Sequence, residues 1–316
     1  MCLDVQPSER VTVITDWACR EIADALVAEI ARVGAPHRLF VLEEEAPRPL
    51  VALPQAIAAD LEQSQVSIFA ARVQANELGS RMAMTDIVNC RRMRHAHMVN
   101  ITPRIMSEGM RADYAIVDRI SARVLETVRR ASRIRATTPA GSAFEATFTP
   151  AYRWIKTSGL ISPEKWGNLP GGEVFTTPVE VNGTFVIDGV VGDWLCEKYG
   201  RLDRTPLTIR VEQNRLVEAT SADAALREDF WRYTHTDENS DRVGEFAIGT
   251  NIEIRQVIGQ ILQDEKFPGI HIAFGNPYGA HTGADWYSST HIDVVGTEFD
   301  IWVDEVPLMR RGQFLL

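Results

Sequence analysis

The first third of the chain alternates short apolar runs with amphipathic segments. Residues 11–15 (VTVIT) form a β-branched run typical of a buried strand, and apolar residues then recur every three or four positions through residues 18–34. Two further apolar runs, at 38–43 and 65–71, flank a second segment of helical pattern at 54–64. Strands that alternate with helices predict an N-terminal α/β domain built on a doubly wound parallel sheet.

The pattern changes after a long amphipathic segment at residues 112–134, which predicts a helix that closes the first domain. We therefore predict one domain over residues 1–135 and a second over residues 136–316. In the second domain short alternating segments are separated by turn residues such as Asn182-Gly183, a pattern typical of antiparallel strands. This domain is predicted to be mixed α+β and to be rich in antiparallel strands.

Seven segments of the second domain are predicted to be strands: 173–181, 183–191, 207–214, 244–250, 270–275, 290–296 and 299–305. Helical spacing predicts two helices among them, at residues 222–231 and 251–265.

Charge and hydropathy narrow the class of protein. The formal net charge is -10, from 33 Lys and Arg against 43 Asp and Glu. This charge opposes the counterion release that drives binding to nucleic acids and anionic membranes, so we expect neither partner. A signal-peptide pattern and a run of about 18 apolar residues are missing, which predicts a cytoplasmic protein. The four scattered cysteines are interpreted as free thiols.

The first candidate site residues are His291 and Asp293, which form an H-x-D pair in the predicted strand 290–296. Residues two apart in a strand point to the same face, so an imidazole and a carboxylate would converge there and could bind one metal ion. The alternative is an ordinary polar face at a strand edge.

Three more candidates lie at or near the starts of predicted strands. Glu173 follows a Pro-Gly-Gly turn, Glu245 follows a glycine, and His271 precedes an apolar run that ends in a Gly-Asn-Pro-Tyr-Gly turn. Metal ligands and solvated charges are both common at such positions, and a histidine there can also be a satisfied core residue.

These segments together resemble the aminopeptidase T family, also called thermophilic metallopeptidases. NLPGGEVFTTP, GEFAIGTN, HIAFGNPY and THID appear in the family's order, and this chain is similar to a short branch of it. The resemblance implies a homodimeric metallohydrolase that cleaves peptides or small amides with two divalent ions. Carboxylate and imidazole ligands without thiolates suit Zn, Co, Mn or Mg. It implies five metal ligands, Glu173, Glu245, His271, His291 and Asp293, and two catalytic residues, Glu245 as proton acceptor and Tyr278 as donor to the oxyanion.

A second resemblance offers an alternative function. The 2,5-dihydroxypyridine 5,6-dioxygenase family is similar to the same scaffold and implies one Fe(II) ion held by two histidines and an aspartate, a set that His291 and Asp293 fit. In that family the first glutamate is absent and a histidine replaces the second. Since this chain keeps Glu173 and Glu245, hydrolysis is favoured.

Two sets of residues have weaker claims to a site. Arg94, His95 and His97 lie in a basic stretch that is interpreted as a solvated turn or, alternatively, as a binder of a substrate carboxylate. His281 and Asp285 lie between the matched segments and are second-choice ligands.

Overall fold

The computed structural model describes all residues of the chain except 75 and 165. Contacts divide it into two compact units, here called unit 1 (residues 1–114 and 159–171) and unit 2 (residues 115–158 and 172–316). The units therefore do not divide at a single point near residue 135: the chain enters unit 2 after residue 114 and returns to unit 1 at residues 159–171. Helix α6 (Tyr114–Val128), expected to close the first domain, instead packs in unit 2, because its apolar side chains Val124 and Val128 join the core of that unit.

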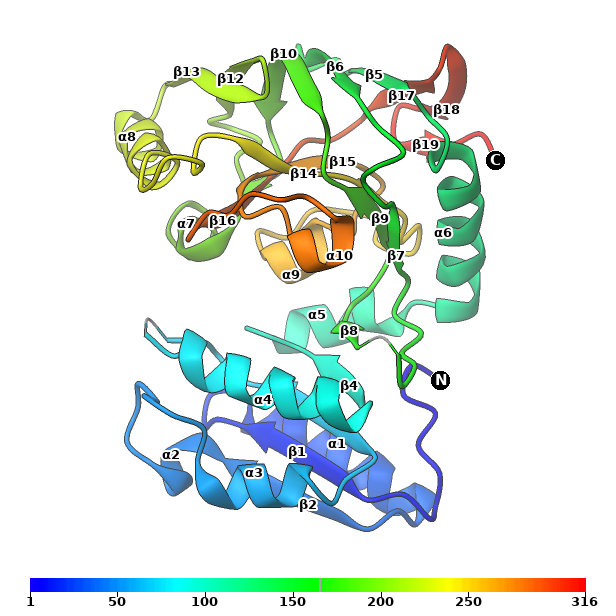
Figure 1. The fold of residues 1–316 in the computed structure, drawn as a ribbon, viewed down its shortest axis with the longest axis vertical. Helices are drawn as coiled ribbons and strands as arrows, with labels where there is room; N and C mark the ends of the chain where they lie inside the picture. The colour runs from blue at the N-terminus through cyan, green and yellow to red at the C-terminus, as the bar shows by residue number, and fades with distance from the viewer. Residues whose placement is uncertain (75, 165) are drawn as a thin grey trace. The chain divides into compact units, whose positions relative to one another are not determined.

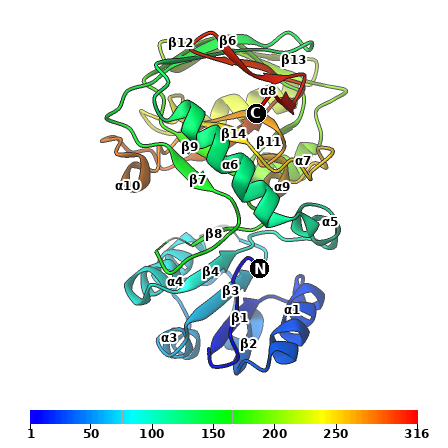
Figure 2. The ribbon, with the colours of Figure 1, turned by 90° about the vertical axis from the view of Figure 1, so that its right-hand side faces the viewer.

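Unit 1 is a parallel sheet covered by helices. Sheet A has the order β2-β1-β3-β4-β8, and all its strand pairs are parallel. Figure 2 shows α1 on one face of this sheet and α3 and α4 on the other, which explains why all five residues of β1 are buried. The elements are β1 Val11–Thr15, α1 Arg20–Val33, β2 His37–Val41, α2 Leu42–Glu45, α3 Gln55–Leu61, β3 Val66–Ala70, α4 Leu78–Arg91, β4 Arg94–His97, α5 Pro103–Ser107, the 3-10 helix η1 Gly109–Arg111 and β8 Gly167–Asn168.

The basic stretch that was expected to be a solvated turn forms strand β4, so that interpretation is wrong. His95 and His97 are buried, at 0% and 8% exposure. Their rings are hydrogen bonded to each other at 3.1 Å, and His95 Nδ1 lies 2.8 Å from the Ser67 hydroxyl, so neutral imidazoles are tolerated in the sheet. Arg94 donates to the backbone carbonyl of Asp4 and forms an ion pair with Glu9.

These buried histidines predict a loss of stability in acid. Burial lowers the pKa of His95 to about 3, whereas an unfolded histidine titrates near 6.5. The unfolded chain therefore binds the extra proton as pH falls below about 6.5, and stability falls with it. For His95 alone this costs about 2 kcal/mol at pH 5.

The measurement is urea unfolding of the protein at pH 7.5 and pH 5. His95→Gln should shrink the loss between the two pH values by about 2 kcal/mol. His37→Gln, which removes an imidazole at the less buried start of β2, is the control and should leave the loss unchanged. An equal acid loss in wild type and His95→Gln would refute the assignment.

Unit 2 consists of two antiparallel sheets around one core. Sheet B has the order β13-β12-β10-β6-β5-β17-β18-β19, and sheet C has the order β11-β16-β15-β14-β9-β7. Apolar side chains from both sheets form the core, among them Phe185 and Ile301 from sheet B and Phe246 and Ile272 from sheet C. Figure 1 shows sheet C between sheet B and the short helices α9 and α10.

The strands of sheet B are β5 Arg133–Thr137, β6 Ala143–Thr147, β10 Glu180–Ile187, β12 Leu207–Glu212, β13 Arg215–Ser221, β17 Asp300–Val303, β18 Val306–Arg310 and β19 Gln313–Phe314. Those of sheet C are β7 Ile155–Thr157, β9 Glu173–Thr176, β11 Val190–Val191, β14 Val243–Gly249, β15 Gly269–Gly275 and β16 His291–Val295. The helices, apart from α6, are α7 Asp193–Tyr199, α8 Ala224–Tyr233, α9 Ile261–Asp264 and α10 Gly279–Thr282.

Parallel sheet A and antiparallel sheets B and C confirm the predicted fold class, but two local predictions are wrong. Asn182-Gly183 is not a turn: it lies inside β10, where a Cβ at Gly183 would come within 2.4 Å of a backbone oxygen of the paired strand. Of the helix predicted at 251–265 only α9 forms. The carboxylate of Asp264 accepts three backbone N–H groups from residues 258–260 and holds that segment as a loop. Among the described residues, no helix combines the length and apolar character needed to cross a bilayer.

Candidate metal centre

The alternation of side chains along sheet C sorts its residues onto two faces. Val174, Phe246, Ile272 and Ile292 point into the core between the sheets. Their sequence neighbours must point the opposite way, because successive side chains in a strand alternate. One face of sheet C therefore carries Glu173 from β9, Glu245 from β14, His271 from β15, and His291 and Asp293 from β16.

The strand register brings these side chains together. Glu245 is paired with Ala273, and Ala273 in turn with Asp293, so the two carboxylates lie in one row across three strands. His271 lies two residues along β15 from Ala273, next to Ala247 of β14. The two alanines are fully buried, and their small side chains leave space between the longer polar ones.

The polar atoms of the five residues lie within a few ångströms of one another. His271 Nε2 is 3.5 Å from Glu245 Oε1, 3.6 Å from Glu173 Oε2 and 4.0 Å from Asp293 Oδ1. His291 Nε2 is 3.6 Å from Asp293 Oδ1 and 3.9 Å from Glu245 Oε2. We call these five residues the sheet C cluster.

The cluster is shielded from solvent. Glu173, Glu245 and His271 are 6%, 5% and 2% exposed, so the expectation of solvated charges at strand starts does not hold for the two glutamates. Burial raises the pKa of Glu245, and the nearby carboxylates of Asp293 and Glu173 add to the rise. Burial disfavours the charge of Asp293 as well, but the His291 imidazole beside it lowers the pKa of that carboxyl to about 2.

The donor set fits a divalent cation. Glu173, Glu245 and His271 each offer a ligand atom within 4.8 Å of the others. His271 Nε2 is buried and lacks a hydrogen-bond partner in the described structure. A buried polar atom without a partner destabilises the fold, and a bound cation would supply the missing partner. Donors that each lie about 2.0–2.2 Å from one tetrahedral ion are roughly 3.3–3.6 Å apart, close to several distances found here.

The backbone fixes the second imidazole for metal binding. His291 Nδ1 lies 2.9 Å from the carbonyl oxygen of Asn276 and must carry the hydrogen that it donates. In the neutral ring the lone pair is then on Nε2, which faces the carboxylates of Glu245 and Asp293.

Tyr278 lies at the exposed edge of the cluster. Its ring centroid is 4.5 Å from that of His291, and 42% of the residue is exposed. The residue has φ 49°, and its N–H donates to the Asn276 side chain, which orients the turn between β15 and α10. His281 and Asp285, the second-choice ligands, are exposed in the same connection.

Sequence reasoning missed two charged residues beside the cluster, Glu265 and Lys266. Lys266 is 1% exposed, and its Nζ lies 2.7 Å from Glu173 Oε2 and 2.6 Å from Glu265 Oε1. Burial opposes the charge of Lys266, but these two carboxylates raise its pKa above the ordinary value, while burial raises the pKa of Glu265 to about 7. The available signal in the sequence is an acidic and a basic residue just before the apolar strand β15. The predicted helix 251–265, however, includes Glu265 and ends next to Lys266.

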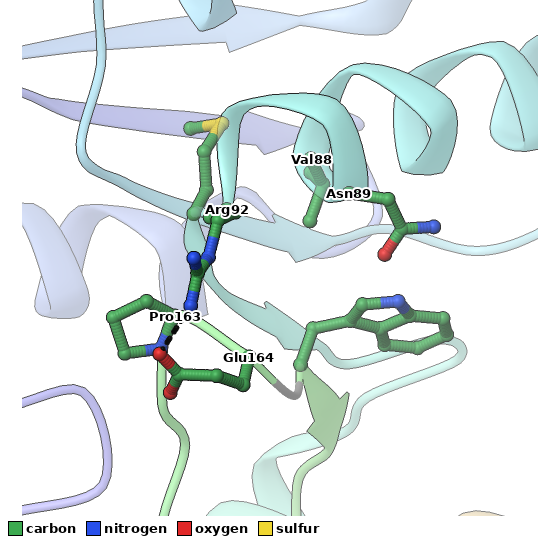
Figure 3. Close-up of a pocket in the computed structure, with 7 residues that line it drawn as sticks. Val88, Asn89, Arg92, Pro163 and Glu164 are labelled. Atoms are coloured by element: carbon green, nitrogen blue, oxygen red, sulfur yellow. Dashed lines mark hydrogen bonds and ion pairs between the residues drawn. The ribbon is translucent and has the colours of Figure 1, made fainter.

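A pocket in unit 1 has different chemistry. It has a volume of about 280 Å³ and is lined by Val88, Asn89, Arg92, Pro163 and Glu164 among others (Figure 3). Arg92 and Glu164 are joined by an exposed ion pair of 2.7 Å. The described lining contains no imidazole and no thiol, so the sheet C cluster is the better candidate for chemistry.

Comparison with known families decides the class to which this cluster belongs. The thermophilic metalloprotease family (M29) matches residues 121–314, more than half of the chain. The chain belongs to this M29 family. The matched range contains all five residues of the sheet C cluster, and the M29 assignment together with the buried Glu173, Glu245 and His271 group indicates an enzyme that binds a divalent metal.

The fold of this M29 member also has a solved counterpart. The structure of 2,5-dihydroxypyridine dioxygenase from Pseudomonas putida KT2440 is similar with a TM-score of 0.71 and 15% sequence identity, over 99% of this chain and 93% of that one. At this identity the likeness concerns the fold alone. The curated proteins contain no significant match to the chain.

Proposed function

We propose that the chain is a metal-dependent hydrolase of the aminopeptidase type, which cleaves a peptide or a small amide. The observation that carries the proposal is the buried sheet C cluster, in which two imidazoles and three carboxylates from four strands face one another and His271 Nε2 has no hydrogen-bond partner among the described residues. Membership in a metalloprotease family supports the choice of hydrolysis.

The chemistry of the donors limits the metal. Carboxylate and imidazole ligands without thiolates suit Zn, Co, Mn or Mg. A divalent ion bound there would act as a Lewis acid and would lower the pKa of a water molecule toward neutrality. We propose His271, His291, Asp293 and Glu245, with Glu173 beside them, as the residues that hold it.

Glu245 and Tyr278 have the geometry for the two proton-handling roles. Burial and neighbouring carboxylates raise the pKa of Glu245, which brings the carboxylate closer to the working range of a general base, so Glu245 is proposed to take the proton of the attacking water. Tyr278 is partly exposed beside His291, where a substrate can reach it, and its hydroxyl is proposed to donate a hydrogen bond to the oxyanion.

The alternative is a mononuclear Fe(II) dioxygenase that cleaves an aromatic ring. The Pseudomonas dioxygenase has a similar fold, and the observation that favours this alternative is that His291 and Asp293 suit the ligand set of two histidines and one aspartate. The buried carboxylates Glu173 and Glu245 favour hydrolysis. The cytoplasmic location and the homodimer stay predictions.

Metal removal and replacement test the proposed activity. Chelation should abolish the hydrolysis of amino-acid amides, and Zn, Co or Mn should restore it. The reason is that the metal ion held by the cluster is proposed to activate the attacking water. Amide turnover and oxygen uptake are measured on the same samples. One tightly bound iron per chain, with oxygen uptake on dihydroxylated rings and no amide turnover, would replace hydrolysis by the dioxygenase.

A further inference from the structure

The sheet C cluster contains a cation supplied by the protein itself. The ammonium of Lys266 lies between Glu173 Oε2, at 2.7 Å, and Glu265 Oε1, at 2.6 Å, and the side chain is 1% exposed. A lysine is rarely buried so completely unless its charge is paired, and here it is paired twice. One of the two partners of Lys266 is Glu173, which the family resemblance implies to be a metal ligand.

Both carboxylate oxygens of Glu173 are already hydrogen bonded within the protein. Oε2 accepts from Lys266, and Oε1 accepts from the Thr157 hydroxyl at 2.8 Å. The carboxylates of Glu245 and Asp293 differ from that of Glu173 in this respect. Their oxygens lie 3.5 to 4.0 Å from Nε2 of His271 and His291, at ion-pair distances that exceed the short hydrogen bonds of Glu173.

The ligand atoms that are not tied up by Lys266 or Thr157 are therefore enough for one ion and not for two. His271 Nε2, His291 Nε2 and the carboxylates of Glu245 and Asp293 provide four protein ligands around a common space. A second ion would have to use Glu173 or Glu265, and it would then lie next to the positive charge of Lys266 in a buried environment, where like charges repel strongly.

We propose that the Lys266 ammonium occupies the position of a second divalent ion, so that the centre binds one ion on His271, His291, Glu245 and Asp293. Glu173 then positions Lys266 instead of acting as a metal ligand. This inference rests on the proposed metal centre, but it replaces the two ions that the family resemblance implies. The centre is then mononuclear, like that of the alternative dioxygenase, but its ion need not be iron.

The first test is the metal stoichiometry of the wild-type protein. The chain is stripped with chelator, titrated with Zn²⁺ by calorimetry, and analysed for bound zinc after desalting. One equivalent per chain is expected. Two equivalents of comparable affinity would overturn the proposal, whatever the activity of the protein.

Two glutamine variants test the different roles of the carboxylates. Glu245→Gln should weaken binding of the single zinc ion at least a hundredfold, whereas Glu173→Gln should change it less than tenfold. Circular dichroism checks that both variants fold. A loss of zinc affinity for Glu173→Gln as large as that for Glu245→Gln would show that Glu173 is a ligand and would contradict the proposal.

A lysine variant tests whether the ammonium excludes the second ion. Lys266→Gln frees Glu173 and Glu265, so the zinc content should rise from one equivalent to two. Lys156→Gln is the matched control. It removes a lysine of strand β7, in the same sheet, that is paired with Asp118 of α6, and it should keep one equivalent. A folded Lys266→Gln variant that still binds one equivalent would overturn the exclusion by lysine. Zinc binding without amide turnover would refute the hydrolase and leave this inference intact.

Discussion

Glu245→Gln is expected to lower kcat for amide hydrolysis by about 10²–10⁴-fold at saturating metal, the range contributed by a positioned general base. Glutamine has nearly the same shape as glutamate but cannot take a proton at neutral pH. The substitution removes one of four carboxylates that are crowded around the cluster, so the protein should stay folded. Steady-state kinetics over a range of zinc concentrations separates the loss of the base from weaker metal binding.

The matched control for this experiment is Glu218→Gln. Glu218 is an exposed glutamate on β13 of sheet B, and its loss should leave kcat unchanged. If saturating zinc restored full turnover to Glu245→Gln, then Glu245 would serve only to bind the metal, and the base would have to be another group.

The sheet-and-helix order of unit 1 could be predicted because each of its elements is encoded locally. Strands β1 and β3 are continuous apolar runs, and α1 has apolar residues at helical spacing, followed by Gly34 with φ 85° at its C-terminus. Strand β4 could not be found in this way. Two of its three buried residues are histidines, and their burial depends on Ser67 and on each other, partners that only the folded sheet brings together.

The candidate site could be predicted in part for a related reason. The H-x-D spacing in β16 fixes two side chains on one face from the sequence alone. The addition of Glu173, Glu245 and His271 needed the family resemblance, because the register that joins β9, β14, β15 and β16 is set by long-range pairing. Their joint function as ligands stays a prediction, although the structure brings their polar atoms together.

Lys266 could be predicted as a site residue neither from residue spacing nor from the family resemblance. The predicted helix 251–265 ends at Glu265, and a lysine that follows such a segment is normally a solvated charge. The structure ends α9 at Asp264, and Lys266 is buried between Glu173 and the half-buried Glu265. Two opposite charges that stabilise each other only after burial leave no periodic signal, since their energy depends on desolvation and on distances across the fold.

His271→Gln is expected to remove most of the stability that metal confers. Loss of a direct imidazole ligand should weaken zinc binding at least a hundredfold, more than the roughly 10–100-fold that outer-shell partners contribute. At zinc concentrations of 1,000 times the wild-type Kd, bound metal stabilises the wild type by about 4 kcal/mol, and a hundredfold weaker site retains about 1.4 kcal/mol. Urea unfolding with and without zinc measures this difference.

The same variant without metal should also lose stability, because the carboxylates of Glu173, Glu245 and Asp293 lie 3.5–4.0 Å from His271 Nε2 and lose the imidazole that partners them. The zinc effect is therefore taken, for each protein, as the difference between its free energies of unfolding with and without zinc. His281→Gln, at the exposed second-choice position, should keep the full zinc stabilisation. If His281→Gln lost it and His271→Gln did not, the ligand would come from the connection between β15 and β16. A zinc-dependent stabilisation of His271→Gln as large as that of the wild type would show that His271 is not a ligand.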